Sequence, residues 1–205
     1  MEVARAGLSL ETADKALVLL HGRGASAQSI LPLADALDAT DFAVLAPQAS
    51  GGQWYPQRFT ALRERNEPYL SQALAGLESL LTDVKNAGIA SENIIIGGFS
   101  QGACLAAEFV ASHPQRYGGL LVFSGGLIGA GTSVAADDYG GSLDATPIFI
   151  GCSDVDPHIP LERVNETISV LGQLGAEVDA QIYPNMAHTI TQAELERTKK
   201  VVARV

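Results

Sequence analysis

Apolar residues follow two different spacings along this chain. Short, nearly continuous apolar runs alternate with longer segments in which apolar residues recur at helical spacing. We expect strands over residues 16–20, 42–46, 93–97, 120–124, 148–151 and 178–183. We expect helices over residues 29–37, 69–87, 101–113 and 160–174, and a last helix that begins near residue 191. Strands that alternate with helices are typical of α/β proteins, in which a mostly parallel sheet is covered by helices on both faces.

The segment 69–87 shows the helical spacing best, and Gly88 ends it. Its apolar stripe consists of Leu70, Ala73, Leu74, Leu77, Leu80, Leu81 and Val84. Two other segments, 48–68 and 125–145, have no clear period. The second is rich in Gly, Ala, Ser and Asp, so we expect a mobile loop there. No break in the alternation marks a second domain, and we expect one domain over residues 1–205 without a large cap.

A Gly-Phe-Ser-Gln-Gly motif over residues 98–102 lies between a predicted strand and a predicted helix. This setting is typical of a nucleophile elbow, a tight turn that presents a serine at the carboxyl edge of the sheet. The glycines at both ends of the motif remove side chains that would collide with the neighbouring strand and helix. Ser100 is therefore the candidate nucleophile.

A serine hydroxyl is a weak nucleophile and needs an adjacent base. Of the four histidines, only His188 follows the last predicted strand and precedes the last predicted helix, which is the position of the base in folds with this elbow. An acid should hold its imidazole from the loop after the strand 148–151. Asp154 and Asp156 both lie there. We favour Asp156, because it stands directly before the next helix.

Acyl transfer also needs donors for the negative charge that develops on the carbonyl oxygen. The residue after the nucleophile, Gln101, supplies one backbone N–H in such folds, and the loop after an early strand supplies the other. The stretch His21-Gly22-Arg23-Gly24 suits this second position, since two glycines allow a close turn. We expect the backbone N–H of Arg23 to be the second donor, and the sequence leaves open whether its side chain binds an anion.

Composition excludes several other classes of function. The formal net charge is −10 at pH 7, and no basic run offsets it, which argues against nucleic acid as a partner. No apolar run is long enough to span a bilayer, and the N-terminus does not resemble a signal peptide. The two cysteines form no metal-binding pattern and suggest a reduced, cytoplasmic protein. We expect no metal and no cofactor. The oligomeric state stays open, a homodimer included.

Taken in order, four stretches carry a family resemblance: 20–24 (Leu-His-Gly-Arg-Gly), 98–102 (Gly-Phe-Ser-Gln-Gly), 156–160 (Asp-Pro-His-Ile-Pro) and 183–188 (Tyr-Pro-Asn-Met-Ala-His). The chain resembles the phospholipase/carboxylesterase family of α/β-hydrolases, which includes bacterial carboxylesterases and acyl-protein thioesterases. The resemblance supports Asp156 as the acid. It also implies that Trp54 and Tyr55 correspond to the aromatic pair that lines the family's acyl pocket.

The resemblance implies an esterase for small or medium acyl esters or thioesters, which acts through an acyl-enzyme without a cofactor. The segment 48–68 looks short and 125–145 long for this family, so its substrate range carries over poorly. Two alternatives are a lysophospholipase and a dienelactone-type hydrolase, although a cysteine nucleophile would favour the latter. A third is a ligand-binding relative without activity, which the presence of all three triad residue types argues against.

Overall fold

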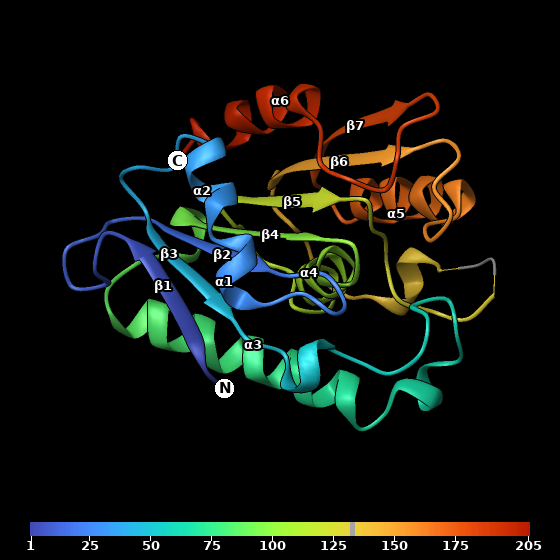
Figure 1. Cartoon of the computed structure of the whole chain (residues 1–205), viewed down its shortest axis with the longest axis horizontal. Helices are drawn as coiled ribbons and strands as arrows, with labels where there is room; N and C mark the ends of the chain where they lie inside the picture. Colours follow the sequence, from blue (N-terminus) through green and yellow to red (C-terminus); the bar gives the residue numbers. More distant parts are fainter. Residues whose placement is uncertain (132–133) are drawn as a thin grey trace.

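The computed structural model describes residues 1–131 and 134–205 and contains a seven-stranded sheet. The spatial order of its strands is β1-β3-β2-β4-β5-β6-β7 (Figure 1). The edge strand β1 pairs antiparallel with β3, and the remaining pairs are parallel. The strands are β1 (Val3–Gly7), β2 (Ala16–Leu20), β3 (Ala43–Pro47), β4 (Ile94–Phe99), β5 (Gly119–Phe123), β6 (Pro147–Ser153) and β7 (Glu177–Tyr183).

Helices cover both faces of the sheet, as the sequence predicts (Figure 1). The α-helices are α1 (Ala27–Ile30), α2 (Pro32–Ala36), α3 (Tyr69–Asn86), α4 (Gln101–Ser112), α5 (Leu161–Gln173) and α6 (Gln192–Val202). Short 3-10 turns occur at η1 (Ser50–Gly52), η2 (Arg63–Asn66), η3 (Ser91–Asn93) and η4 (Ala136–Asp138). Helix α4 packs on β4 and β5, with α3 against its outer side, while α1 and α6 lie on the opposite face.

Alternating residues of the central strands pack into two separate hydrophobic cores. In β2, Val18 and Leu20 belong to the core under α3, α4 and α5, whereas Leu17 and Leu19 belong to the core under α1, α2 and α6. All five residues of β2 are buried, which explains why the strand reads as one unbroken apolar run. Burial of both faces is what a parallel sheet between helical layers requires.

The six predicted strands and the predicted helices are present, with two local differences. The sequence reasoning missed β1, since its half-exposed edge position places Arg5 and glycine in a strand without an apolar run. The predicted helix 29–37 is two short helices, and the second begins at Pro32. A proline fits the first position of a helix, where no backbone N–H is needed.

The prediction of a mobile loop over 125–145 is wrong for its first part. Residues 125–128 are buried, and Arg163 of α5 donates hydrogen bonds to the carbonyl oxygens of Leu127, Gly129 and Gly131 at 2.7–3.0 Å. The small residues are there for close packing: a Cβ on Gly125 would lie 2.6 Å from the Cβ of Ala103. Residues 132 and 133 of this segment lie outside the described residues.

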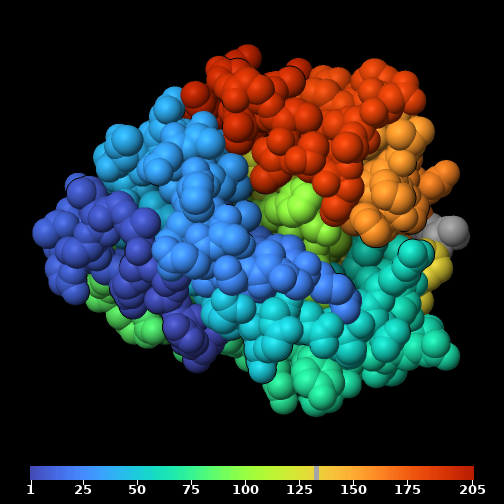
Figure 2. All heavy atoms as spheres, viewed as in Figure 1, coloured from blue at the N-terminus to red at the C-terminus, as the bar shows by residue number. Residues whose placement is uncertain are grey.

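The parallel strands bring distant segments of the chain together at their carboxyl ends. The loops that follow β2, β4, β6 and β7 carry Arg23, Ser100, Asp156 and His188 respectively. In the space-filling view, the green middle of the chain lies in a hollow between blue and cyan N-terminal segments and red C-terminal segments (Figure 2). The candidate site therefore lies where the topology predicts it.

Candidate active site

Ser100 occupies a strained turn between β4 and α4. Its backbone has φ 56° and ψ −118°, a conformation that residues other than glycine rarely adopt. Its N–H donates to the carbonyl of Phe123 on the neighbouring strand at 3.0 Å, which fixes the turn to the sheet. The sequence prediction of a nucleophile elbow agrees with this geometry.

The two glycines of the motif are needed because the backbone is crowded on both sides. A Cβ on Gly102 would lie 2.1 Å from the carbonyl oxygen of Leu20, and one on Gly98 would lie 2.5 Å from the carbonyl carbon of Gly102. Backbone atoms cannot yield as a flexible side chain can. The close approach of α4 to β2 and β4 therefore excludes any larger residue.

Ser100, His188 and Asp156 form one hydrogen-bonded chain. Nε2 of His188 lies 2.8 Å from Oγ of Ser100, and Nδ1 of His188 lies 2.7 Å from Oδ2 of Asp156. The Asp156 carboxylate is fully buried, whereas the His188 side chain is 17% exposed and faces the pocket. Phe99 packs against the imidazole with ring centroids 4.8 Å apart. The arrangement can move a proton from the serine to the imidazole while the carboxylate holds the other ring nitrogen.

The two aspartates of the β6–α5 loop have different partners. The second oxygen of Asp156, Oδ1, accepts hydrogen bonds from the backbone N–H groups of His158 and Ile159. Asp154 instead accepts from the N–H of Asn185 at 2.8 Å, in the loop that leads to His188. The structure thus brings Asp156 to the imidazole, and Asp154 stabilises a neighbouring turn.

Both expected oxyanion donors lie beside Ser100. Gln101 begins α4, so its N–H has no partner within the helix, and Arg23 lies on the loop after β2. Within the described chain, neither N–H forms a hydrogen bond, and both residues line the same pocket as Ser100. Two unpaired N–H groups at this edge are suited to bind a negatively charged oxygen.

The side chain of Arg23 connects the loop after β2 to residues 53–57. Its guanidinium donates to the carbonyl oxygens of Tyr55, Pro56 and Gln57 at 2.7–3.0 Å and to Oε1 of Gln53. The side chain of Gln101 continues the same connection, because its Nε2 donates to the Tyr55 carbonyl at 2.7 Å. These contacts tie the loop after β2 to residues 53–57, a role that the sequence motifs did not indicate.

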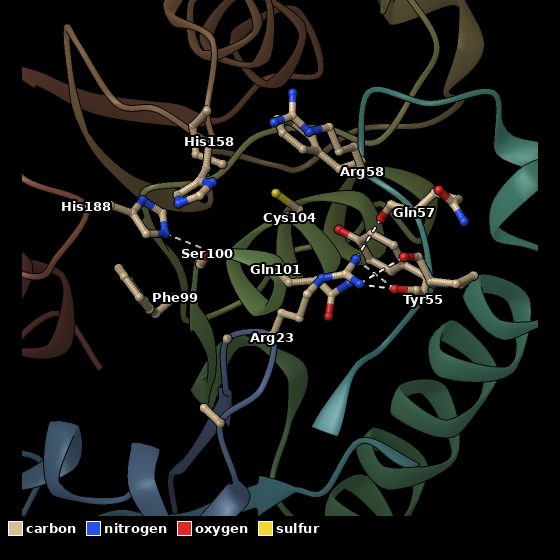
Figure 3. A pocket seen from close by; sticks show the side chains of 15 residues that line it. Arg23, Tyr55, Gln57, Arg58, Phe99, Ser100, Gln101, Cys104, His158 and His188 are labelled. Carbon is tan, nitrogen blue, oxygen red and sulfur yellow. Dashed lines mark hydrogen bonds between the residues drawn. The ribbon is translucent and has the colours of Figure 1, made fainter. Parts of the chain in front are cut away.

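A pocket of about 540 Å³ opens beside Ser100 (Figure 3). Its lining includes Tyr55, Arg58, Phe99, Cys104, His158 and Ile159. Burial raises the pKa of the Cys104 thiol to about 12, so this cysteine stays protonated and is a poor nucleophile. The same holds for Cys152, whose pKa burial also raises to about 12. Ser100 is the nucleophile that the geometry favours.

The aromatic pair expected in the pocket is divided. Tyr55 lines the pocket beside Ser100, whereas Trp54 lines a separate cavity with Met1, Gln48 and Tyr69. The Trp54 indole is buried and donates to the carbonyl of His21 at 2.8 Å. It therefore supports the loop after β2 from behind. Sequence reasoning missed Arg58 and His158 as lining residues, because neither belongs to a periodic element.

Within the described residues, no helix is long and apolar enough to cross a bilayer. No cluster of three or more His, Cys, Asp or Glu side chains suited to a metal ion occurs in the same part of the chain.

Comparison with known proteins gives consistent results. The family model described as Phospholipase/Carboxylesterase matches residues 8–205. Acyl-protein thioesterase 1 of Saccharomyces cerevisiae is 29% identical, with 96% of this chain and 95% of that protein covered. The crystal structure of a phospholipase/carboxylesterase from Dyadobacter fermentans is 37% identical and superposes with a TM-score of 0.95, covering 98% of this chain and 96% of that one. A probable inactive carboxylesterase from Oryza sativa subsp. japonica is 26% identical over 71% of this chain and 59% of that protein.

Proposed function

Since this chain belongs to the phospholipase/carboxylesterase family, we propose that it is an active serine esterase that cleaves small or medium acyl esters or thioesters. The observation that carries the proposal is the continuous hydrogen-bonded chain from Ser100 through His188 to Asp156. A relative that had lost activity would not be expected to keep all three groups in register. The pocket beside Ser100 supplies the space for an acyl ester.

The first half of the reaction forms an acyl-enzyme. Oγ of Ser100 attacks the carbonyl carbon, and its proton passes to Nε2 of His188, 2.8 Å away. The carbonyl oxygen takes the negative charge and receives hydrogen bonds from the N–H groups of Arg23 and Gln101. Asp156 stabilises the imidazolium through Nδ1. When the tetrahedral intermediate collapses, the ester C–O or thioester C–S bond breaks, and the leaving group takes the proton from Nε2.

The second half reverses these roles with water. A water molecule attacks the acyl carbon, transfers a proton to Nε2 of His188, and the bond to Oγ of Ser100 breaks. Ser100 regains its proton from the imidazolium, and the carboxylic acid leaves. No cofactor takes part in these steps, and water is the only co-reactant.

Two measurements test the proposal. A fluorophosphonate probe should label the purified protein at Ser100, and hydrolysis of p-nitrophenyl butyrate should fall by on the order of 10⁴-fold in Ser100→Ala. Protein that resists the probe and hydrolyses no ester would be a ligand-binding relative instead. Activity that survives in Ser100→Ala would show that another group is the nucleophile. Preferred hydrolysis of lysophospholipids would favour the lysophospholipase alternative, and preferred hydrolysis of lactones would favour the dienelactone-type alternative.

A further inference from the structure

The charged side chains around the pocket are basic, although the chain as a whole is acidic. Among the described lining residues, the basic side chains are Arg23, Arg58, His158 and His188, and none is an aspartate or a glutamate. The formal net charge of the chain is −10 at pH 7. A basic cleft on an acidic protein attracts anions locally and is not explained by the general charge of the surface.

Arg58 differs from Arg23 because its guanidinium has no partner among the described residues. Its guanidinium is exposed and forms no ion pair or hydrogen bond within the described chain, whereas the Arg23 guanidinium already has four neutral acceptors. The backbone beneath Arg58 is nevertheless fixed. The buried side chain of Asn66 donates to the Arg58 carbonyl at 3.2 Å and accepts from the N–H of Gln57 at 2.8 Å. A free charge on an anchored backbone is suited to bind a ligand.

His158 lies on the same side of the pocket as Arg58, across from Arg23 (Figure 3). Its ring is exposed and meets the His188 ring edge-on, with centroids 4.8 Å apart. Its backbone is held by Oδ1 of Asp156 at 2.8 Å. An imidazole offers at least one N–H donor in either protonation state. Both Arg58 and His158 line the pocket and can donate hydrogen bonds to an anion bound there.

The position of His158 beside His188 indicates which part of a substrate they meet. In the proposed reaction, Nε2 of His188 gives its proton to the oxygen or sulfur of the leaving group, which must therefore lie next to this imidazole. A group attached to the leaving alcohol or thiol extends past His188. Phe99 and His158 both pack against that ring and line the pocket, and of the two His158 is the one that can donate a hydrogen bond to an anion.

We propose that this enzyme selects esters or thioesters whose alcohol or thiol portion carries a negative charge, and that Arg58 and His158 bind that charge. The inference rests on the proposed function. Because the anion is bound in the ground state and in the transition state alike, the preference should be seen mainly in KM.

The test compares charged and neutral members of matched pairs by pH-stat titration of the released acid. In the first pair the leaving group differs: 4-(butanoyloxy)butanoate against its primary amide, 4-(butanoyloxy)butanamide. In the second pair the acyl group differs: monobutyl adipate against butyl adipamate. We expect kcat/KM to favour the anion about tenfold in the first pair, which corresponds to a charge-assisted hydrogen bond, and not in the second.

Three variants assign the preference. Arg58→Gln should reduce the charged-to-neutral ratio of the first pair about three- to tenfold, and His158→Leu should reduce it less. Arg65→Gln is the matched control, because Arg65 is exposed on the neighbouring turn and does not line the pocket. Its ratio should equal that of the unmodified enzyme.

The outcomes separate the inference from the proposed function. If both members of the first pair are hydrolysed equally well, the function stands and the inference is wrong. If no ester is hydrolysed, the proposed function itself fails. The inference is also overturned if the preference for the anion persists in Arg58→Gln, or if the preference occurs in the acyl pair only. It is overturned as well if Arg65→Gln reduces the preference as much as Arg58→Gln does, since the preference would then come from the overall electrostatic field of the protein.

Discussion

Replacing Arg23 by alanine tests whether the oxyanion loop is held in place from outside. The change leaves the backbone N–H of Arg23 intact but removes four hydrogen bonds to Gln53, Tyr55, Pro56 and Gln57. Most of these bonds are exposed, so we assign about 0.5 kcal/mol to each and about 2 kcal/mol to the set. For a domain of this size, that loss lowers Tm by about 4–8 °C.

The catalytic effect should exceed what this loss of stability suggests. Without the guanidinium, the loop after β2 loses its connection to residues 53–57, and the Arg23 N–H can shift from its position beside Ser100. A full loss of one oxyanion donor costs about 10²–10³ in kcat, and a displacement of about 1 Å can cost about a hundredfold. We therefore expect kcat to fall about ten- to a hundredfold at a temperature well below Tm, with p-nitrophenyl butyrate as substrate.

Arg23→Lys distinguishes geometry from charge. Lysine keeps the positive charge, but its ammonium cannot span four acceptors arranged around a planar guanidinium. We expect its kcat to lie near that of Arg23→Ala. Full activity in the lysine variant would mean that charge alone matters at this position. A lowered Tm with unchanged kcat in the alanine variant would refute the link between the guanidinium and the oxyanion loop.

Four further substitutions test the identity of the acid, the crowding at the elbow and a buried carboxyl group. Asp156→Asn should lower kcat by about 10⁴-fold, while Asp154→Asn should change it less than tenfold. Steady-state rates of both variants on the same ester measure the difference, and the reverse ranking would assign the acid role to Asp154. Gly102→Ala should destabilise the fold by several kcal/mol or prevent soluble expression, because its Cβ would lie 2.1 Å from a backbone oxygen; urea unfolding that matches the parent would contradict the crowding argument. Burial raises the pKa of Glu194, so the folded state favours its protonated form, and this stabilisation is lost as pH rises through the raised pKa. Glu194→Gln should therefore raise Tm at pH 7, and this gain should shrink toward pH 4. Thermal unfolding of both proteins over this pH range measures the gain, and a gain independent of pH would refute the role of the buried charge.

The strands and the nucleophile turn could be predicted because their physical causes are local in the sequence. A strand buried on both faces, such as β2, must be apolar at each position, and a turn without room for a Cβ must have glycine. The edge strand β1 has no partner on its outer side and is partly to fully exposed along its length, so no apolar run marks it. Partial burial alone does not hide a strand: β7 is also partly buried, but its alternating apolar and polar residues indicate it, whereas β1 has no such alternation.

The pocket could not be predicted in the same way, because its residues are positioned by contacts between loops. Trp54 and Tyr55 are adjacent and both aromatic, yet the indole turns into the core toward His21 while Tyr55 lines the pocket. Nothing in the two residue types distinguishes these directions. Likewise, the packing of 125–128 depends on Arg163, more than thirty residues later, so its glycine-rich composition suggested mobility.

The supports of the pocket also explain why substrate selection and catalysis should be coupled. Asp156 divides its two oxygens between the His188 imidazole and the backbone of His158 and Ile159. One buried carboxylate therefore orients the base and also fixes the loop that carries a proposed anion ligand. A leaving group bound by His158 would be positioned relative to His188 through this one carboxylate, which favours the geometry in which the proton is transferred. Asparagine at position 156 separates the two roles, because its remaining oxygen can still accept from the backbone N–H groups of His158 and Ile159 while the imidazole contact is altered. We therefore expect Asp156→Asn to reduce kcat far more than it changes the preference for a charged leaving group.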